Sequence, residues 1–178
     1  MTDPDIQQRA ARIKLLALDV DGTLTDGQLW FSDDGIQYKA FSAHDGLGLK
    51  LLRQHGIEAA IITARTSPVV EVRARDLGIT HVYQGSRDKR ASLLDLCSKL
   101  NLDPLDTAMM GDDLSDLPAM RICGLAAAPA NAHPWMDGRV HWKGERSGGF
   151  GAVRELCDLL LSAQGKVDFI LDSYWPAP

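Results

Sequence analysis

Residues 15–26 read LLALDVDGTLTD, an apolar run that stops at an aspartate and continues into a second aspartate, a glycine and polar residues. Two further apolar runs, Ala59–Thr63 and Thr107–Gly111, also end in small or polar residues. Short apolar runs of this kind are typical of strands buried on both faces of a parallel sheet. Segments with helical spacing lie between the runs: Asp45–His55, Ser67–Leu77 and Asp88–Leu100. Strands that alternate with helices predict an α/β fold with a doubly wound parallel sheet.

The rest of the chain gives weaker signals. We expect Ser67 to be the N-cap of its helix, because Pro68 follows it at the first turn. A final helix is predicted over Gly151–Ala163, followed by a C-terminal tail over about 165–178. Three additional strands are expected, at His81–Gln84, Leu125–Ala127 and Val140–Trp142.

The segment Gly27–Phe41 breaks the alternation. Apolar residues at Leu29–Phe31 precede the turn-like stretch Ser32–Gly35, and a second apolar pattern follows the turn. This arrangement predicts a β-hairpin inserted between the first strand and the first helix. Its aromatic and aliphatic side chains have no obvious place on the solvent face of a monomer, so the hairpin is expected to meet a partner.

Length and composition favour one self-sufficient domain, residues 1–178, because the chain is 45% apolar. A formal net charge of −5 argues against a nucleic acid or an anionic membrane as partner. The polar N-terminus lacks the apolar stretch that a signal peptide or membrane span requires, which favours the cytoplasm. The cysteines are odd in number, far apart and among apolar neighbours, so we expect buried thiols at Cys97, Cys123 and Cys157.

Polar side chains at the ends of the three main strands are the candidate catalytic groups. Ligands of open α/β sheets bind beyond the carboxyl ends of the strands, so these side chains should converge. Asp19 can attack phosphorus to form an acyl phosphate, and Asp21 is close enough to exchange protons with the leaving group and with water. Gly22 permits the sharp turn that follows. Thr63 and Lys89 could hold the phosphoryl oxygens.

A carboxylate nucleophile and a phosphate repel each other, so a hard cation is expected between them. Mg²⁺ suits oxygen ligands, and Asp19, Asp112, a backbone carbonyl and waters would supply them. Asp113 and Asp116 could orient Asp112 or the metal-bound waters. Alternatively, these two aspartates only cap the helix that follows Gly111.

These motifs resemble those of a known superfamily. Asp19-x-Asp21-Gly22-Thr23, Thr63, Lys89 and Gly111-Asp112-Asp113 are similar to the four motifs of the haloacid dehalogenase-like hydrolases. Three longer stretches, residues 61–65, 77–85 and 148–155, look like the 3-deoxy-D-manno-octulosonate 8-phosphate (KDO 8-phosphate) phosphatases, which are small members without a cap domain. The resemblance implies a Mg²⁺-dependent phosphatase of lipopolysaccharide precursor synthesis, with Asp19 as nucleophile and Asp21 as acid/base. It also implies that the metal is held by Asp19, the Asp21 backbone carbonyl and Asp112.

The resemblance further implies substrate contacts and an assembly. The implied contacts come from Asp21, Ser42, Ala43, His44, Asp45, Gly46, Lys50, Arg65, Arg73 and Lys89. Members of the family are similar in being homotetramers, which implies that the hairpin at 27–41 builds a collar. In such an assembly the neighbouring subunits close the site, and the C-terminal tail acts as a small lid.

Several alternatives stay open. The sequence has Ala64 where the family usually has Gly, His44 where Arg is common and Phe150 where it usually has Arg. The last two changes remove cations that could meet the sugar carboxylate, so phosphates of other keto-deoxy sugar acids, such as nine-carbon relatives, are alternative substrates. Arg65 and Arg73 could instead form ordinary surface ion pairs. The alternatives of another class are a phospho-acceptor receiver domain and a non-catalytic oligomerisation module.

Overall fold

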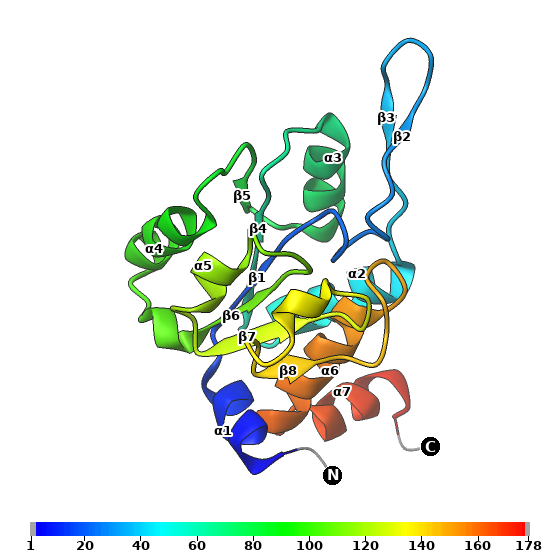
Figure 1. Cartoon of the computed structure of the whole chain (residues 1–178). Coiled ribbons are helices and arrows are strands. Elements are labelled where there is room, and N and C mark those ends of the chain that lie inside the picture. The colour runs from blue at the N-terminus through cyan, green and yellow to red at the C-terminus, as the bar shows by residue number, and fades with distance from the viewer. Residues whose placement is uncertain (1–2, 177–178) are drawn as a thin grey trace.

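A six-stranded parallel sheet lies at the centre of the computed structural model, which describes residues 3–176 (Figure 1). Its strands are β1 (Leu15–Leu18), β4 (Glu58–Ile62), β5 (His81–Tyr83), β6 (Thr107–Met110), β7 (Leu125–Ala128) and β8 (Trp142–Lys143). Their spatial order is β5-β4-β1-β6-β7-β8, and every neighbouring pair is parallel. Leu18 of β1 is in register with Ile61 of β4 and Met110 of β6. The three strands therefore end at one edge, and the predicted doubly wound parallel sheet is confirmed.

Helices cover both faces of the sheet. One face packs against α1 (Pro4–Arg12), α2 (Ala43–Gln54), α3 (Pro68–Leu77) and α6 (Ala152–Ala163). The other face packs against α4 (Lys89–Leu100) and α5 (Leu117–Met120). The remaining helical segments are two 3₁₀ turns, Pro104–Asp106 and Pro134–Met136, and the helix α7 (Val167–Tyr174). None of the helices within residues 3–176 has both the length and the apolar run needed to cross a membrane.

The alternation of side chains along β1 explains why its sequence is apolar throughout. Leu16 and Leu18 pack into the core on the α2 and α6 side, whereas Leu15 and Ala17 pack on the α4 side. A strand with helices on both faces has no solvent side, so it needs no polar positions. The three cysteines are free and buried, as predicted.

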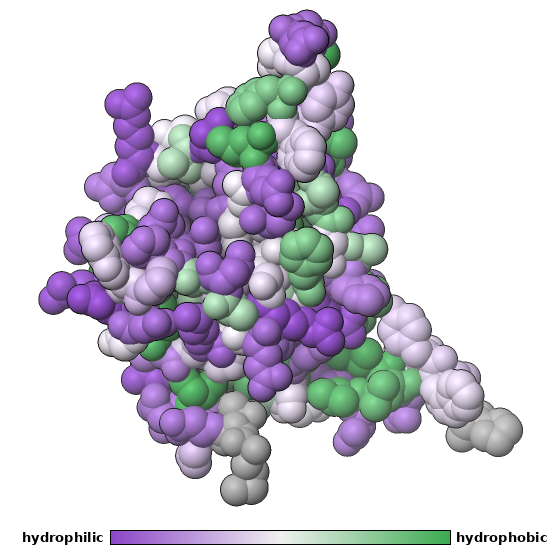
Figure 2. Space-filling model, turned by 45° about the vertical axis from the view of Figure 1, so that its right-hand side comes forward, coloured by the Kyte–Doolittle hydropathy of each residue, from purple (hydrophilic) through white to green (hydrophobic). Residues whose placement is uncertain are grey.

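The hairpin β2 (Trp30–Phe31) and β3 (Gln37–Tyr38) is antiparallel and projects from the body of the molecule (Figure 1). Figure 2 shows apolar side chains along this projection. Trp30 is 59% exposed and Phe31 is 57% exposed. The predicted insertion is therefore present, and its apolar side chains are not covered by the rest of the chain.

Several predicted details differ from the structure. Ser67 occupies the N-cap position of α3, but its hydroxyl makes no hydrogen bond to the helix. The strand predicted at Val140–Trp142 lies slightly later, at Trp142–Lys143. The helix expected after Gly111 is present as α5, whereas α1 and α7 were not predicted because they bury few side chains, and α7 buries none. In α1 only Ile6 and Ala10 are buried.

The C-terminal tail lies away from the chain's own strand ends. Its helix α7 packs Phe169 edge-on against His55, with 5.7 Å between the ring centroids. His55 follows the end of α2 that lies farthest from the carboxyl edge of the sheet (Figure 1). Within its own subunit the tail therefore does not cover the carboxyl edge, and the last two residues, 177–178, are outside the described range.

Candidate active site

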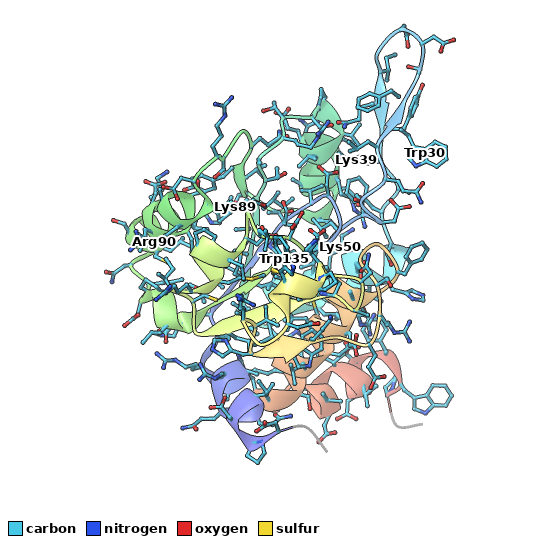
Figure 3. All side chains as sticks on the ribbon, viewed as in Figure 1. Trp30, Lys39, Lys50, Lys89, Arg90 and Trp135 are labelled. Atoms are coloured by element: carbon cyan, nitrogen blue, oxygen red, sulfur yellow. The ribbon has the colours of Figure 1, made fainter. Side chains whose placement is uncertain are left out.

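Carboxylates from two neighbouring strands meet at the carboxyl edge of the sheet. Asp19 follows β1, whereas Asp112 and Asp116 follow β6, and one oxygen from each of the three lies within 4.8 Å of the others. The buried Lys89, the first residue of α4, reaches into this cluster (Figure 3). Its Nζ lies 2.8 Å from Asp19 Oδ1 and 2.5 Å from Asp116 Oδ1. Residues that are far apart in the sequence thus form one charged cluster, as the strand ends predicted.

Asp116 holds the loop that carries Asp112. Its Oδ2 accepts hydrogen bonds from the backbone N–H groups of Asp112, at 3.0 Å, and Asp113, at 3.2 Å. A Cβ at Gly111 would lie 2.2 Å from the Asp116 carboxylate, so only glycine leaves room for it. Asp116 makes no side-chain cap bond to α5. Of the two roles considered for Asp116, the geometry favours orienting Asp112 over capping a helix.

Burial and mutual repulsion make the cluster a fitting place for a cation. Burial, together with the charge of Asp116, raises the pKa of Asp19 to about 6. Burial, together with the charges of Asp19 and Asp116, raises the pKa of Asp112 to about 7. Burial disfavours the charge on Lys89, but the two carboxylates beside it outweigh that effect and raise its pKa. Buried carboxylate oxygens that repel one another suit Mg²⁺, and Asp19 and Asp112 are the two with the fewest other partners.

The loop after β1 is built so that Asp112 can approach it. Gly22 has φ +90°, and a Cβ there would lie 2.0 Å from Asp112 Oδ2. Two further glycines, Gly148 and Gly149, support the same loop from outside, and a Cβ at Gly148 would lie 1.8 Å from the Gly22 carbonyl oxygen. The Gly149 N–H donates to the Thr23 carbonyl at 3.1 Å. The close approach of two backbones, rather than ligand binding, explains the glycines at 148 and 149.

Asp21 lies between two cations. Lys39, just after β3, donates from Nζ to Asp21 Oδ1, and its side chain is only 1% exposed. On the other oxygen, Arg65 Nε lies 3.8 Å from Asp21 Oδ2, and the Arg65 side chain is 47% exposed. Arg65 was predicted near this site, but Lys39 was not. A lysine in an exposed hairpin normally faces water, and no pattern in the sequence distinguishes this one.

Thr63 is buried at the carboxyl end of β4, next to β1 in the sheet. Its hydroxyl accepts only a long hydrogen bond, 3.5 Å, from the Arg65 backbone N–H. Its own carbonyl accepts from the Ser86 N–H at 3.0 Å, which ties the β4 end to the segment before α4. The hydroxyl therefore lies at the edge of the sheet where the carboxylates gather and remains able to donate to a ligand.

The predicted contact stretch, residues 42–46, is held mainly by structural bonds. Ser42 caps α2, and its carbonyl accepts from Arg73 Nη2 at 3.0 Å. Arg73 also pairs with Asp76 at 2.8 Å. Asp45 is buried and caps a different helix, since its Oδ1 accepts from the Arg154 N–H at the start of α6 at 2.8 Å. In this structure Arg73 and Asp45 therefore join α2 to α3 and α6.

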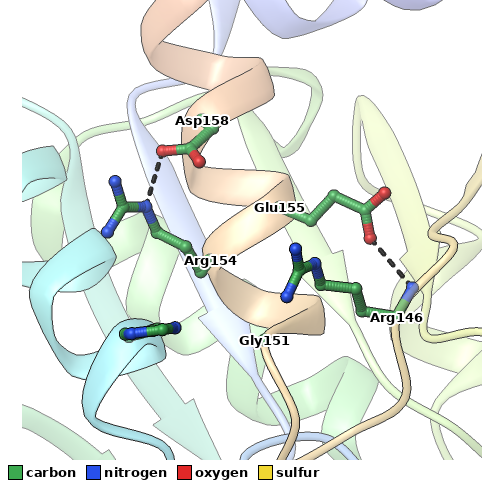
Figure 4. A pocket seen from close by; sticks show the side chains of 6 residues that line it. Arg146, Gly151, Arg154, Glu155 and Asp158 are labelled. Atoms are coloured by element: carbon green, nitrogen blue, oxygen red, sulfur yellow. Dashed lines mark hydrogen bonds and ion pairs between the residues drawn. The ribbon is translucent and has the colours of Figure 1, made fainter.

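The remaining predicted contacts lie outside the carboxylate cluster. Lys50 is 46% exposed and lies 3.9 Å from Asp76. His44 is exposed and lines a separate cavity of about 430 Å³ beside the start of α6 (Figure 4). The other residues lining that cavity are Arg146, Gly151, Arg154, Glu155 and Asp158. Ala43 and Gly46 lie in the first turn of α2, where a Cβ at Gly46 would meet Arg73.

Known proteins share this sequence and fold. The family model for haloacid dehalogenase-like hydrolases matches residues 43–124. The 3-deoxy-D-manno-octulosonate 8-phosphate phosphatase of Escherichia coli BL21 is 47% identical over 164 residues, which cover 92% of this chain and 87% of that protein.

Solved structures agree with this similarity. The phosphatase of the same name from Moraxella catarrhalis, in complex with magnesium, phosphate and KDO, has a TM-score of 0.95 and 42% identity, covering 97% of this chain and 99% of that chain. The Yersinia pestis phosphatase has a TM-score of 0.93 and 44% identity, covering 94% of this chain and 90% of that chain. The chain belongs to the 3-deoxy-D-manno-octulosonate 8-phosphate phosphatase family of the haloacid dehalogenase-like hydrolases.

Proposed function

We propose that the chain hydrolyses 3-deoxy-D-manno-octulosonate 8-phosphate to KDO and inorganic phosphate, with Mg²⁺ and through an aspartyl phosphate on Asp19. The observation that carries the proposal is the cluster of Asp19, Lys89, Asp112 and Asp116 at the carboxyl edge of the sheet. Support also comes from relatives that bear this phosphatase name, and from the Moraxella relative in complex with magnesium, phosphate and KDO.

In the first step an Asp19 carboxylate oxygen attacks phosphorus. The new oxygen–phosphorus bond forms while the bond from phosphorus to the sugar oxygen breaks, and Asp21 gives its proton to that leaving oxygen. Lys89 holds Asp19 Oδ1 at 2.8 Å and fixes the direction of attack. Lys89 and the Thr63 hydroxyl hold the phosphoryl oxygens as charge develops on them.

In the second step water attacks the phosphorus of the aspartyl phosphate. Asp21, now a carboxylate, takes a proton from that water, and the bond from phosphorus to Asp19 breaks to release inorganic phosphate. Mg²⁺, held by Asp19, Asp112 and the Asp21 backbone carbonyl, supplies the positive charge that lets a carboxylate approach a phosphate. Asp116 keeps Asp112 in place through its bonds to the loop backbone.

Hydrolysis of p-nitrophenyl phosphate with Mg²⁺ and with EDTA tests the reaction class. We expect turnover with Mg²⁺ only, and we expect Asp19→Asn to abolish it while the circular dichroism spectrum stays unchanged. A folded protein without metal-dependent turnover would favour a receiver-like or non-catalytic domain. Activity retained by Asp19→Asn would place the nucleophile elsewhere.

A steady-state screen of sugar phosphates tests the substrate. We expect the eight-carbon acid phosphate to have the highest kcat/KM, ahead of nine-carbon keto-deoxy acid phosphates and of hexose phosphates. His44 and Phe150 stand where the family usually has arginine, so these positions are the natural ones to exchange. Equal kcat/KM for the eight-carbon acid and for generic hexose phosphates would contradict the substrate assignment.

We propose that the chain acts as a homotetramer joined through the hairpin at 27–41. The exposed Trp30, Phe31 and Tyr38 support this proposal, because a soluble monomer rarely presents such a group on a projecting element. Analytical ultracentrifugation should give four times the mass of one chain. The double variant Trp30→Ser/Phe31→Ser should sediment as a smaller species, and an unchanged mass would place the interface elsewhere.

We also propose a cytoplasmic location, in lipopolysaccharide precursor synthesis. Three free, buried cysteines suit a compartment in which thiols stay reduced. Fractionation of the source cells with an antibody against the chain tests the location, and recovery outside the cytoplasmic fraction would contradict it.

A further inference from the structure

Lys39 is a buried cation that the reaction described above does not use. It follows β3 at the foot of the hairpin (Figure 3), and its side chain pairs with Asp21 instead of facing water. Its Nζ donates to Asp21 Oδ1, and only 1% of the side chain is exposed. A buried ammonium is costly unless it is paired, so the position of Lys39 is tied to that of Asp21.

Asp21 depends on Lys39 for its orientation more than Asp116 depends on any one of its partners. Asp116 is held by two backbone N–H groups and by Lys89. Within residues 3–176 the Asp21 carboxylate accepts no backbone hydrogen bond, and its other cation, Arg65, lies 3.8 Å away on a half-exposed side chain. Among the described residues, Lys39 is therefore the one buried group that fixes the direction of the Asp21 carboxyl.

We infer that Lys39 is a positioning residue for proton transfer: it holds the Asp21 carboxyl where it can deliver its proton to the leaving oxygen. This inference rests on the proposed function. As the bond from phosphorus to the leaving oxygen breaks, the proton passes from Asp21 to that oxygen, and Lys39 stays bound to Asp21 Oδ1. Lys39 itself contacts neither the phosphoryl group nor the leaving oxygen.

The leaving group provides the test. An aliphatic sugar oxygen needs a proton to depart, whereas p-nitrophenolate departs without one. kcat/KM covers the reaction up to the departure of the leaving group. It therefore reports the proton transfer to the leaving oxygen and is independent of the later hydrolysis of the aspartyl phosphate. We expect Lys39→Met to lower kcat/KM about 100-fold for the sugar phosphate and less than about fivefold for p-nitrophenyl phosphate. The KM values should stay close to those of the wild type.

Matched variants make the result specific. Asp21→Asn should also lower kcat/KM much more for the sugar phosphate than for p-nitrophenyl phosphate. The double variant Lys39→Met/Asp21→Asn should lose no more kcat/KM than Asp21→Asn alone, because both substitutions remove the same proton transfer. Lys39→Arg should recover part of the loss, and it also serves if Lys39→Met does not fold. Lys143→Met removes a more exposed lysine–aspartate pair outside the site, with Asp137 at 2.7 Å, and should change neither rate.

The outcomes separate the inference from the proposed function. Equal losses with both substrates, or additive losses in the double variant, would overturn the positioning role. A large rise in KM with unchanged kcat would also overturn it, because Lys39 would then be a substrate contact. If the wild type hydrolyses neither substrate, the proposed function fails instead.

Discussion

Replacing Gly22 by alanine should disable the site while leaving the fold largely intact. The added Cβ would lie 2.0 Å from Asp112 Oδ2, whereas real Cβ atoms do not approach other heavy atoms closer than 3.0 Å. The Asp112 carboxylate must therefore retreat by at least 1.0 Å. A misplacement of this size in a catalytic site can lower the rate about 100-fold. We expect kcat/KM to fall by at least that factor, together with a weaker affinity for Mg²⁺.

The same substitution has a separate effect on stability. Gly22 has φ +90°, and a non-glycine residue in the left-handed region costs roughly 1–2 kcal/mol. For a chain of this size each kcal/mol lowers the Tm by about 2–4 °C. Gly56→Ala is the matched control, because Gly56 has φ +84° with nothing within 4 Å of an added Cβ. It should show a similar fall in Tm with unchanged activity.

The assays are Mg²⁺-dependent hydrolysis, calorimetric titration with Mg²⁺ and thermal unfolding, on both variants and the wild type. A Gly22→Ala variant that keeps kcat/KM and the Mg²⁺ affinity within about threefold of the wild type would show that the Asp112 carboxylate tolerates the added Cβ. If Gly56→Ala loses as much activity as Gly22→Ala, the backbone strain at positive φ would explain the loss without any contact to Asp112.

Three further expectations concern the carboxylates and the loop support. Burial raises the pKa of Asp45 above its usual value, so Asp45 should contribute a loss of stability as the pH rises from about 4 through that raised pKa. Asp45→Asn should therefore make the fall in stability over this pH range smaller than in the wild type, as measured by urea unfolding, and parallel pH profiles would contradict this expectation. Mg²⁺ at a hundred times its Kd should raise the free energy of unfolding by about 2.7 kcal/mol, and Asp112→Asn should remove most of this gain in thermal unfolding. Gly148→Ala should lower both Tm and kcat/KM, because its Cβ would lie 1.8 Å from the Gly22 carbonyl oxygen. Gly138→Ala is the control and should lower only Tm, because Gly138 has φ +71° but nothing lies within 4 Å of an added Cβ. Normal activity of Gly148→Ala would show that the loop tolerates displacement.

The central strands were predictable because a strand that is buried on both faces is apolar along its whole length. The strands β1, β4 and β6 are buried on both faces, so an unbroken apolar run marks each of them to within one residue. The strand β8 has only two residues, neither of them buried, and the helix α7 has no buried residue, so their sequences resemble loops. Their limits depend on contacts with distant segments.

The same distinction applies to the site. Asp19, Thr63 and Asp112 were predictable because strand ends converge in any parallel sheet. The contacts of Lys39 with Asp21 and of Asp45 with the α6 backbone depend on side-chain directions and on long loops. Neither follows from a periodic pattern, so these contacts are visible only in the folded chain.

The turn at Gly148–Gly149 lies against the Asp19 loop although more than a hundred residues separate them in the sequence. During synthesis Asp19 leaves the ribosome more than a hundred residues before the turn that supports its loop. A nascent chain that has not reached Gly148 therefore contains Asp19 and Asp21 without the turn that supports their loop. A chain terminated before Gly148 is therefore expected to show none of the proposed hydrolysis.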